Sequence, residues 1–242
     1  LYYSDRLLEF PLGMFAVAIS TVILPALAKG HVDQDPKRFS DTMDWGVRMV
    51  LFLGLPAMGG IMVLREPILR VLFMRGEFGP HEVMMSSASL LASTSGLLSL
   101  MLARVLAPGF HARQDTRTPV RYGVHSMVAN MGFNLILIYP LGYVGLALST
   151  ALSGTVNAIS LFQGLYRRDI YRPGKETLWF LLRLIAATLV MYGLLYWLSP
   201  RLEVWVQWSL WRAGLELAKY LALGGVSYLG MAWLLGCRLA DL

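Results

Sequence analysis

The sequence predicts an all-α, polytopic membrane protein with about seven transmembrane helices. Hydrophobic residues make up 56% of the 242 residues and charged residues only 15%, whereas about a quarter of an ordinary globular domain is charged. Several long stretches contain no Asp, Glu, Lys or Arg; they are 10–28, 49–64, 83–103, 122–166, 184–200 and 220–237. A bilayer-spanning helix needs roughly 20 apolar residues, so the longest stretch has room for two spans.

Charged and turn-forming segments separate the first three expected helices. We place these helices at 1–28, 46–64 and 83–106. Pro11 and Gly13 interrupt the helical character of the first, and the second contains Pro56, which membrane helices tolerate. The polar segments that follow the three helices are 29–44, 65–82 and 108–119. We expect loops in the first and third of these and a short interfacial helix in the second.

The remaining helices follow a hairpin and a basic loop. They are expected at 122–139, 143–166, 178–198 and 217–235, with the hairpin turn at Pro140-Leu141-Gly142 and the basic loop at 167–175. The Trp-rich segment 204–211 is expected at the membrane interface, because indole rings favour the headgroup level.

Positive charge is distributed unevenly between the two ends of these helices. Of the 21 Lys and Arg, fourteen lie after the first, third and fifth helices or at the C-terminus, and seven lie on the opposite side. The positive-inside rule therefore places Arg117 and Arg168 in the cytoplasm and Glu77 and Trp205 outside. We attribute the net charge of +6 to the excess of Lys and Arg on the cytoplasmic side of the membrane. We therefore expect no nucleic-acid partner.

The composition also limits the chemistry. The single cysteine, Cys237, excludes a disulfide framework and a cysteine-rich metal site. The four histidines lack paired metal-ligand spacing, and no glycine-rich phosphate loop follows a strand pattern. No enzymatic cofactor is expected. The chain begins without Met or a signal-peptide pattern and is interpreted as part of a longer protein.

Three ionisable residues in the first helix are candidates for substrate binding. Asp5, Arg6 and Glu9 lie within a segment expected to enter the membrane, where charged residues are costly and usually functional. Their spacing places them on neighbouring positions of one helix face, so that Arg6 can pair with Glu9. A guanidinium facing a water-filled cavity can bind phosphate with two hydrogen bonds. The alternative is an ordinary charge at the membrane boundary.

A stripe of polar residues on two later helices suggests a possible sodium site. Asn130 and Asn134 lie four residues apart on one helix, and Thr150 lies on the next. Their carbonyl and hydroxyl oxygens suit a hard cation, although the set lacks a carboxylate. The alternative is packing, because small and polar residues such as Gly145 and Ser149 allow close contact between membrane helices.

A set of short motifs points to one family. The motifs are Tyr2-Tyr3-Ser4-Asp5-Arg6-Leu7, Phe10-Pro11-Leu12-Gly13, Leu24-Pro25, Leu106-Ala107-Pro108-Gly109-Phe110 and Arg113-Gln114-Asp115-Thr116-Arg117-Thr118-Pro119. Together they closely resemble the MurJ (MviN) family of bacterial lipid II flippases, along essentially the whole chain. Arg65-Glu66-Pro67-Ile68 and Leu72-Phe73 before Arg75-Gly76 add thinner support.

The resemblance implies a fold and a division of the chain. The family belongs to the multidrug and oligosaccharidyl-lipid exporter superfamily and has fourteen helices in two lobes around a central cavity. The chain would match helices eight to fourteen. Residues 1–166 would then supply five spans of the second lobe, and residues 167–242 two helices that form a groove for the lipid tail. Arg6 would match the cavity arginine of the family, with Asp5 and Glu9 beside it.

The resemblance further implies a non-enzymatic transporter of the bacterial inner membrane. Its partners would be lipid II, membrane lipids and the missing N-terminal lobe, and its substrate would cross to the outer leaflet by alternating access. Two alternatives remain open: an exporter of other lipid-linked oligosaccharides or drugs, and a lipid-modifying membrane enzyme using His111 and Asp115. Either a sodium gradient or the membrane potential could drive transport.

Overall fold

The computed structural model describes residues 2–74 and 79–237, and every regular element in these ranges is helical. In chain order the elements are α1 (Tyr2–Pro11), the π-helix η1 (Leu12–Val17), α2 (Ala18–Val32), α3 (Pro36–Phe73), α4 (Pro80–Thr94), α5 (Leu97–His111), α6 (Arg117–Leu141), α7 (Tyr143–Arg167), α8 (Lys175–Leu198), α9 (Leu202–Gln207) and α10 (Leu210–Leu234). The all-α membrane fold is confirmed.

Six helical segments in the described ranges are long and apolar enough to cross a bilayer. They are α1–α2 taken together, α3, α4–α5 taken together, α6, α7 and α8. The seventh expected helix forms as α10, which has 25 residues, but it is not among the six. Helix α10 carries Arg212, Glu216 and Lys219 in its first half, so only its second half, from Tyr220 to Leu234, is free of Asp, Glu, Lys and Arg.

The expected interruption of the first helix is present as a π-helix. The segment η1 directly follows Pro11, joins α1 to α2 and has six residues. A proline ring displaces the carbonyl group one turn earlier, which favours a locally wider helix. The chain therefore continues as one span with a change of pitch in its middle.

The prediction of a loop at 29–44 is wrong, because most of this segment is helical. Only Asp33, Gln34 and Asp35 separate α2 from α3. Asp35 caps α3: its Oδ1 accepts a hydrogen bond from the backbone N–H of Arg38 at 3.0 Å, and Pro36 occupies the first helical position. Aspartate followed by proline is also a helix-start signal, which the turn interpretation of these residues missed.

The segment after the second helix also differs from expectation. Instead of a separate interfacial helix in 65–82, α3 continues through Pro67 to Phe73. Leu69 and Arg70 are buried there, so packing supports the added turns. Residues 75–78, including Glu77, lie outside the described residues.

The third expected helix is divided into α4 and α5 at Ser95 and Gly96. Gly96 approaches the backbone of Ala151 so closely that a β-carbon would clash with it. The expected loop at 108–119 shrinks, because α5 extends to His111 and α6 begins at Arg117. The hairpin turn between α6 and α7 is confirmed, with Gly142 at φ +55°, where a glycine is favoured.

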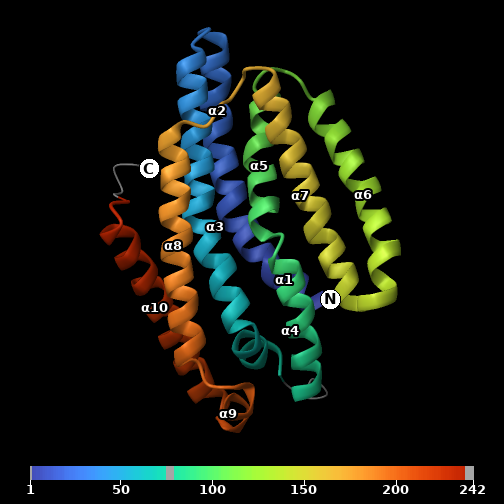
Figure 1. Cartoon of the computed structure of the whole chain (residues 1–242), viewed down its shortest axis with the longest axis vertical. Helices are drawn as coiled ribbons and strands as arrows, with labels where there is room; N and C mark the ends of the chain where they lie inside the picture. Colours follow the sequence, from blue (N-terminus) through green and yellow to red (C-terminus); the bar gives the residue numbers. More distant parts are fainter. Residues whose placement is uncertain (1, 75–78, 238–242) are drawn as a thin grey trace.

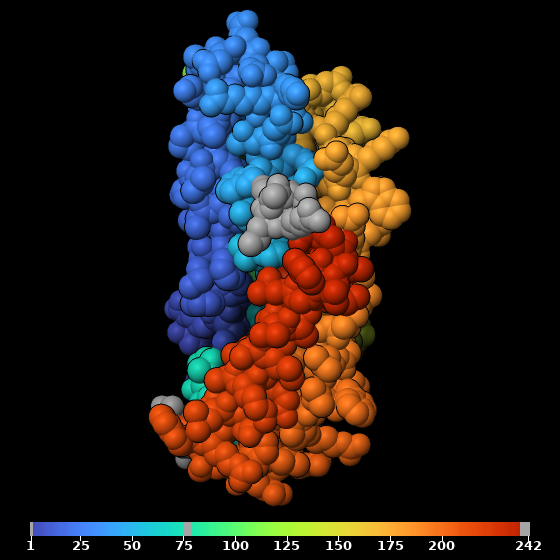
Figure 2. Space-filling view, turned by 90° about the vertical axis from the view of Figure 1, so that its left-hand side faces the viewer, coloured from blue at the N-terminus to red at the C-terminus, as the bar shows by residue number. Residues whose placement is uncertain are grey.

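The helices run up and down between two ends of the molecule (Figure 1). The connections after α2, α5 and α7 lie at the upper end in that view, and those after α3, α6 and α8 lie at the lower end. This is the alternation expected from the Lys and Arg distribution. Figure 2 shows α10 crossing one face of the molecule obliquely, alongside α8.

Buried side chains form two hydrophobic clusters that share α3. One cluster joins α3 to α2, α5 and α7, and the other joins α3 to α8, α9 and α10. Trp205 is fully buried in the second cluster and donates its indole N–H to the carbonyl oxygen of Pro200. It therefore faces the protein interior, whereas Trp211 is exposed. The division of the chain at 166 stays a prediction.

We predict the sidedness of these two ends by thiol labelling. In a full-length variant with Cys237 replaced by Ser, a cysteine at Glu203 should react with an impermeant maleimide in intact cells, because the positive-inside rule places it outside. A cysteine at Arg117 should react only after the membrane is permeabilised. Both positions are exposed in the structure, so labelling of position 117 in intact cells would contradict the orientation.

Candidate functional site

Arg6 lies on the exposed side of α1. Its Nη1 is 2.8 Å from Oε2 of Glu9, and its Nε donates to the hydroxyl of Tyr2 at 3.4 Å. The guanidinium also lies over the Tyr2 ring, 5.3 Å from its centre. The structure thus forms the Arg6–Glu9 pair that the spacing predicts, and Asp5 is exposed beside it.

The opposite side of α1 attaches to α4. Ser4 is fully buried and donates its hydroxyl to the carbonyl oxygen of Ser86 at 3.2 Å. The Arg6 and Glu9 side chains are 56% and 64% exposed, and such exposed ion pairs add little to stability. The fold therefore fixes the backbone of α1 while leaving the Arg6 guanidinium accessible to a ligand.

The asparagine stripe is partly assembled. Asn134 Nδ2 donates to Oδ1 of Asn130 at 3.0 Å, and Asn130 Nδ2 donates to the hydroxyl of Ser153 at 3.3 Å. Asn134 Oδ1 is buried and accepts no hydrogen bond. Thr150 is exposed and donates its hydroxyl to the carbonyl oxygen of Leu146. Its link to the asparagines runs through its backbone: the Thr150 carbonyl accepts the Ser153 hydroxyl, to which Asn130 donates.

The described residues contain no group of three or more His, Cys, Asp or Glu side chains that could hold a metal ion. Close packing explains the small residues of the stripe: a β-carbon at Gly145 would clash with the carbonyl group of Leu137, and Ser149 is fully buried. The described residues therefore offer two buried, unpaired asparagine oxygens, those of Asn134 and Asn157, and tight contact between α6 and α7.

A buried polar network, which the sequence analysis missed, connects α3 to the start of α8. Asp44 accepts hydrogen bonds from Tyr171 at 2.7 Å and from Thr177 at 2.5 Å. Arg48 lies 2.9 Å from the same carboxylate and donates its Nε–H to Thr177 at 2.9 Å. Burial raises the pKa of Tyr171, with the hydrogen bond to Asp44 as the second cause. The i,i+4 spacing of Asp44 and Arg48 was the available sequence signal.

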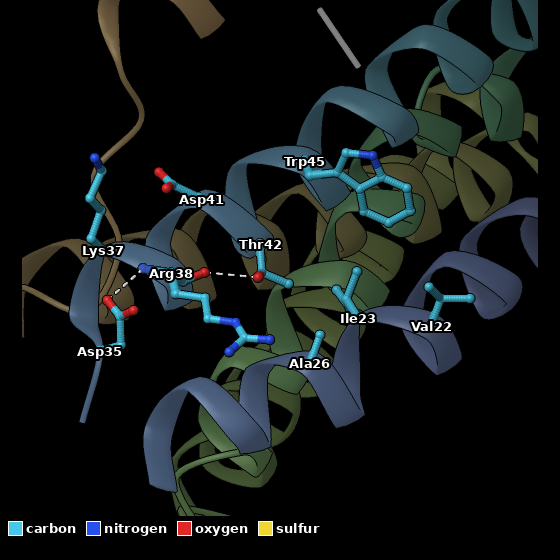
Figure 3. A pocket seen from close by; sticks show the side chains of 9 residues that line it. All are labelled: Val22, Ile23, Ala26, Asp35, Lys37, Arg38, Asp41, Thr42 and Trp45. Atoms are coloured by element: carbon cyan, nitrogen blue, oxygen red, sulfur yellow. Dashed lines mark hydrogen bonds between the residues drawn. The ribbon is translucent and has the colours of Figure 1, made fainter. Parts of the chain in front are cut away.

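A shallow pocket of about 600 Å³ lies between α2 and the first turns of α3 (Figure 3). Charged side chains, including Asp35 and Arg38, surround one end, and Trp45 and Val22 line the other. Asp35 already accepts the Arg38 amide, and the Arg38 carbonyl accepts the hydroxyl of Thr42. Asp35 therefore caps α3 and Thr42 bonds within the same helix, so these two polar side chains already have partners in α3.

Comparison with known proteins identifies the family. A family model described as "Lipid II flippase MurJ" matches residues 1–216. A Vibrio cholerae protein named "Probable lipid II flippase MurJ" is 53% identical over all of this chain and 46% of its own length. The chain belongs to the MurJ family. The "Lipid II flippase MurJ" of Burkholderia cenocepacia is 35% identical over 98% of this chain and 46% of its own length.

A solved MurJ structure has the same fold. It is described as "Lipid II flippase MurJ, inward closed conformation", and it aligns with a TM-score of 0.77 at 23% identity over 95% of this chain and 45% of that chain. The chain thus spans about half the length of the MurJ relatives it matches.

Asp115, in the motif from Arg113 to Pro119, connects the loop before α6 with the loop after α7. Its Oδ1 accepts the backbone N–H of Thr118 at 3.0 Å, and its Oδ2 accepts the Thr118 hydroxyl at 2.6 Å. Arg168, from the loop after α7, lies 2.7 Å from the same Oδ2. The hydroxyl and amide of Thr118, and then Arg168, lower the pKa of Asp115 to about 2. The carboxylate is therefore engaged in structure, which argues against its use with His111 as a catalytic pair.

We predict that Asp115 stabilises the protein in a pH-dependent way. Its pKa is depressed in the folded state, so its contribution is present above its ordinary pKa of about 4 and is lost as the pH falls towards 2. Asp115→Asn should cost about 1 kcal/mol at pH 7, because the neutral amide loses the ion pair with Arg168 and the charge-assisted hydrogen bonds from Thr118, and almost nothing near pH 2. Thermal unfolding in detergent across this range measures the difference.

Asp41→Asn is the matched control, because Asp41 is exposed at the same end and makes no described ion pair. It should leave the unfolding temperature unchanged at every pH. A constant difference between wild type and Asp115→Asn from pH 7 to pH 2 would contradict the assignment.

Proposed function

We propose that this chain works within a lipid II flippase of the bacterial inner membrane, which moves the lipid-linked peptidoglycan precursor from the cytoplasmic to the outer leaflet. Membership of the MurJ family supports this proposal. Among individual residues, the proposal rests on one observation: Arg6, in the Asp-Arg motif of α1, has an accessible guanidinium. Transport by alternating access makes no covalent change to the substrate, so we propose a transporter and not an enzyme.

Arg6 would bind the diphosphate of the substrate. Its planar guanidinium can donate two parallel hydrogen bonds to phosphate oxygens, and its Nη2 makes no hydrogen bond to a described residue. Glu9 would orient the guanidinium before the substrate arrives, and Asp5 would adjust the local charge. The isoprenoid tail would remain in lipid.

The remaining partner would be the other lobe of the same protein. The relatives are about twice as long as this chain, and α6 has no buried residue among those described. Exposed Phe10 and Met14 lie on the segment that contains Arg6. These faces support a proposal in which the first lobe and the lipid cover them, with Arg6 on the wall of a cavity between two lobes.

A related exporter of other lipid-linked oligosaccharides or drugs is the second candidate, because a phosphate-binding arginine would serve any diphosphate-linked lipid equally well. Complementation distinguishes the two. Growth of a bacterium depleted of its lipid II flippase, after expression of the full-length protein, is the expected result. Lysis despite normal expression would contradict lipid II transport.

We predict that Arg6→Ala abolishes this complementation and that Arg6→Lys retains little. Losing a charge-assisted contact of this kind should cost about 2 to 5 kcal/mol of binding free energy, and Lys lacks the paired donors of Arg. Glu9→Gln should be milder, because Glu9 acts through Arg6. Membrane insertion and the unfolding temperature should remain unchanged in all three variants.

The matched control is Arg201→Ala, which removes an exposed arginine from the segment between α8 and α9. It should complement normally. The affinity of the purified full-length protein for lipid II tests the role of Arg6 directly. An unchanged affinity in Arg6→Ala would show that Arg6 serves only as a partner of Glu9 and Asp5.

We further propose that sodium binds at Asn130, Asn134 and Thr150, with ligands added by the rest of the protein. The buried, unpaired Oδ1 of Asn134 supports this proposal. Asn134→Ala should remove any increase in unfolding temperature that sodium chloride gives over potassium chloride at equal ionic strength. Ser160→Ala, on α7, is the matched control, because the Ser160 hydroxyl already donates to the carbonyl oxygen of Val156 within its own helix. An unchanged sodium response in Asn134→Ala would restore the packing explanation.

A further inference from the structure

The helices α7 and α8 follow each other in sequence but do not pack along each other. Helix α7 packs against α4, α5 and α6, whereas α8 packs against α3 and α10. The loop 168–174 carries the chain across from one to the other at the upper end in Figure 1. A crevice of about 470 Å³ remains beneath this loop, between α7 and α8.

The walls of this crevice are almost entirely apolar. They come from α3, α5, α7, α8 and the loop before α8. The apolar lining residues are Val47, Leu51, Leu102, Leu106, Ala158, Ile159, Phe162, Pro173, Leu178 and Leu181. A volume of this size lies in the range of about 300–1,000 Å³ typical of ligand sites.

Apart from Lys175 at its opening, the polar side chains that line the crevice are already paired with protein. The Thr155 hydroxyl donates to the carbonyl oxygen of Ala151 at 2.9 Å and lies 3.0 Å from the Ser99 hydroxyl. Tyr171 and Thr177 both donate to Asp44. A ligand in the crevice therefore meets hydrocarbon-like walls that require no hydrogen bonds. The Asp44 contacts also fix the loop and the first turn of α8, so the crevice is held open by the fold.

The opening of the crevice has the character of a membrane interface. Ile159 on α7 and Leu178 on α8 line it and are 50% and 59% exposed. Lys175, the first residue of α8, also lines it, is exposed and makes no ion pair with a described residue. The neighbouring Glu176 points its carboxylate towards Arg48, 3.8 Å away. The free charge at the opening is therefore positive.

We propose that this crevice binds one acyl chain of an anionic membrane phospholipid, whose phosphate is held by Lys175. The occupant follows from three features: an apolar interior, exposed aliphatic side chains at the opening, and Lys175, the one charged residue among the described residues that line the crevice. The leaflet is the one at the end that carries Arg117 and Arg168. Such a lipid would fill the gap between the body of the protein and α8 without entering the Arg6 site, so this inference is independent of the proposed transport activity.

The test uses the full-length protein in phosphatidylcholine vesicles that contain a small fraction of phosphatidylglycerol with a photoreactive diazirine in one acyl chain. After illumination, peptide mass spectrometry locates the attached lipid. Label is expected on the crevice segments 155–162 and 178–181. The same diazirine chain on phosphatidylcholine should give about fivefold less label there, because it lacks the net charge that Lys175 recognises.

Two variants fill or narrow the crevice. Ala158→Trp places an indole inside, and Ile159→Trp places one at the opening, where folding is less sensitive; both should lose most of the crevice label. Leu189→Trp is the matched control, because Leu189 is exposed on α8 outside the crevice, and it should keep the label. Lys175→Glu should reduce phosphatidylglycerol label about fivefold, whereas Lys37→Glu, at the same end, should not.

Three results would overturn the proposal. The first is crevice label that persists in both Ala158→Trp and Ile159→Trp. The second is equal label from phosphatidylcholine and phosphatidylglycerol, which would remove the role of Lys175. The third is displacement of the label by undecaprenyl phosphate at amounts where unlabelled phosphatidylglycerol fails, which would assign the crevice to the tail of a carrier lipid.

Discussion

The packing of α3 against both halves of the chain is the constraint on which the rest of the structure depends. Its buried side chains contribute to both hydrophobic clusters: Phe39, Met43 and Val50 face the first, and Leu55 and Leu64 face the second. Because lipid tails are as apolar as these side chains, helix association in a membrane relies on close packing and on polar contacts between helices. The Asp44–Arg48 network adds such polar contacts between α3 and the start of α8.

This arrangement explains why the crevice exists. Helix α8 is held by α3 and α10, and α7 is held by α5 and α6, so neither is free to close the gap between them. Tyr171 and Thr177 must also reach Asp44 on α3, which fixes the path of the connecting loop. The crevice is thus a consequence of joining two helix groups through one shared helix.

The sequence was sufficient for the fold class, the order of spans and local pairs, but not for contacts between distant residues. The spacing of Arg6 and Glu9 predicted their contact, since helix geometry alone determines it. The prediction of a long loop before α3 was wrong, because Asp35 and Pro36 suit a turn and a helix start equally well. Local spacing could not reveal Tyr171 as a partner of Asp44, because the two residues lie 127 positions apart and only tertiary packing brings them together. Thr150 was grouped with Asn134 although its side chain faces outward.

Two arginine pairs in this chain differ in burial, and this difference bears on the role proposed for Arg6. Arg48 and Asp44 are each 16% exposed, and breaking such a pair would leave a charge with little access to water, which is strongly unfavourable. Arg6 and Glu9 are 56% and 64% exposed, so water compensates either group when they part. An arginine that must exchange a carboxylate for a phosphate during each transport cycle needs a partner that it can leave at little cost. Of these two arginines, Arg6 has such a partner, and this supports its proposed role in binding the diphosphate.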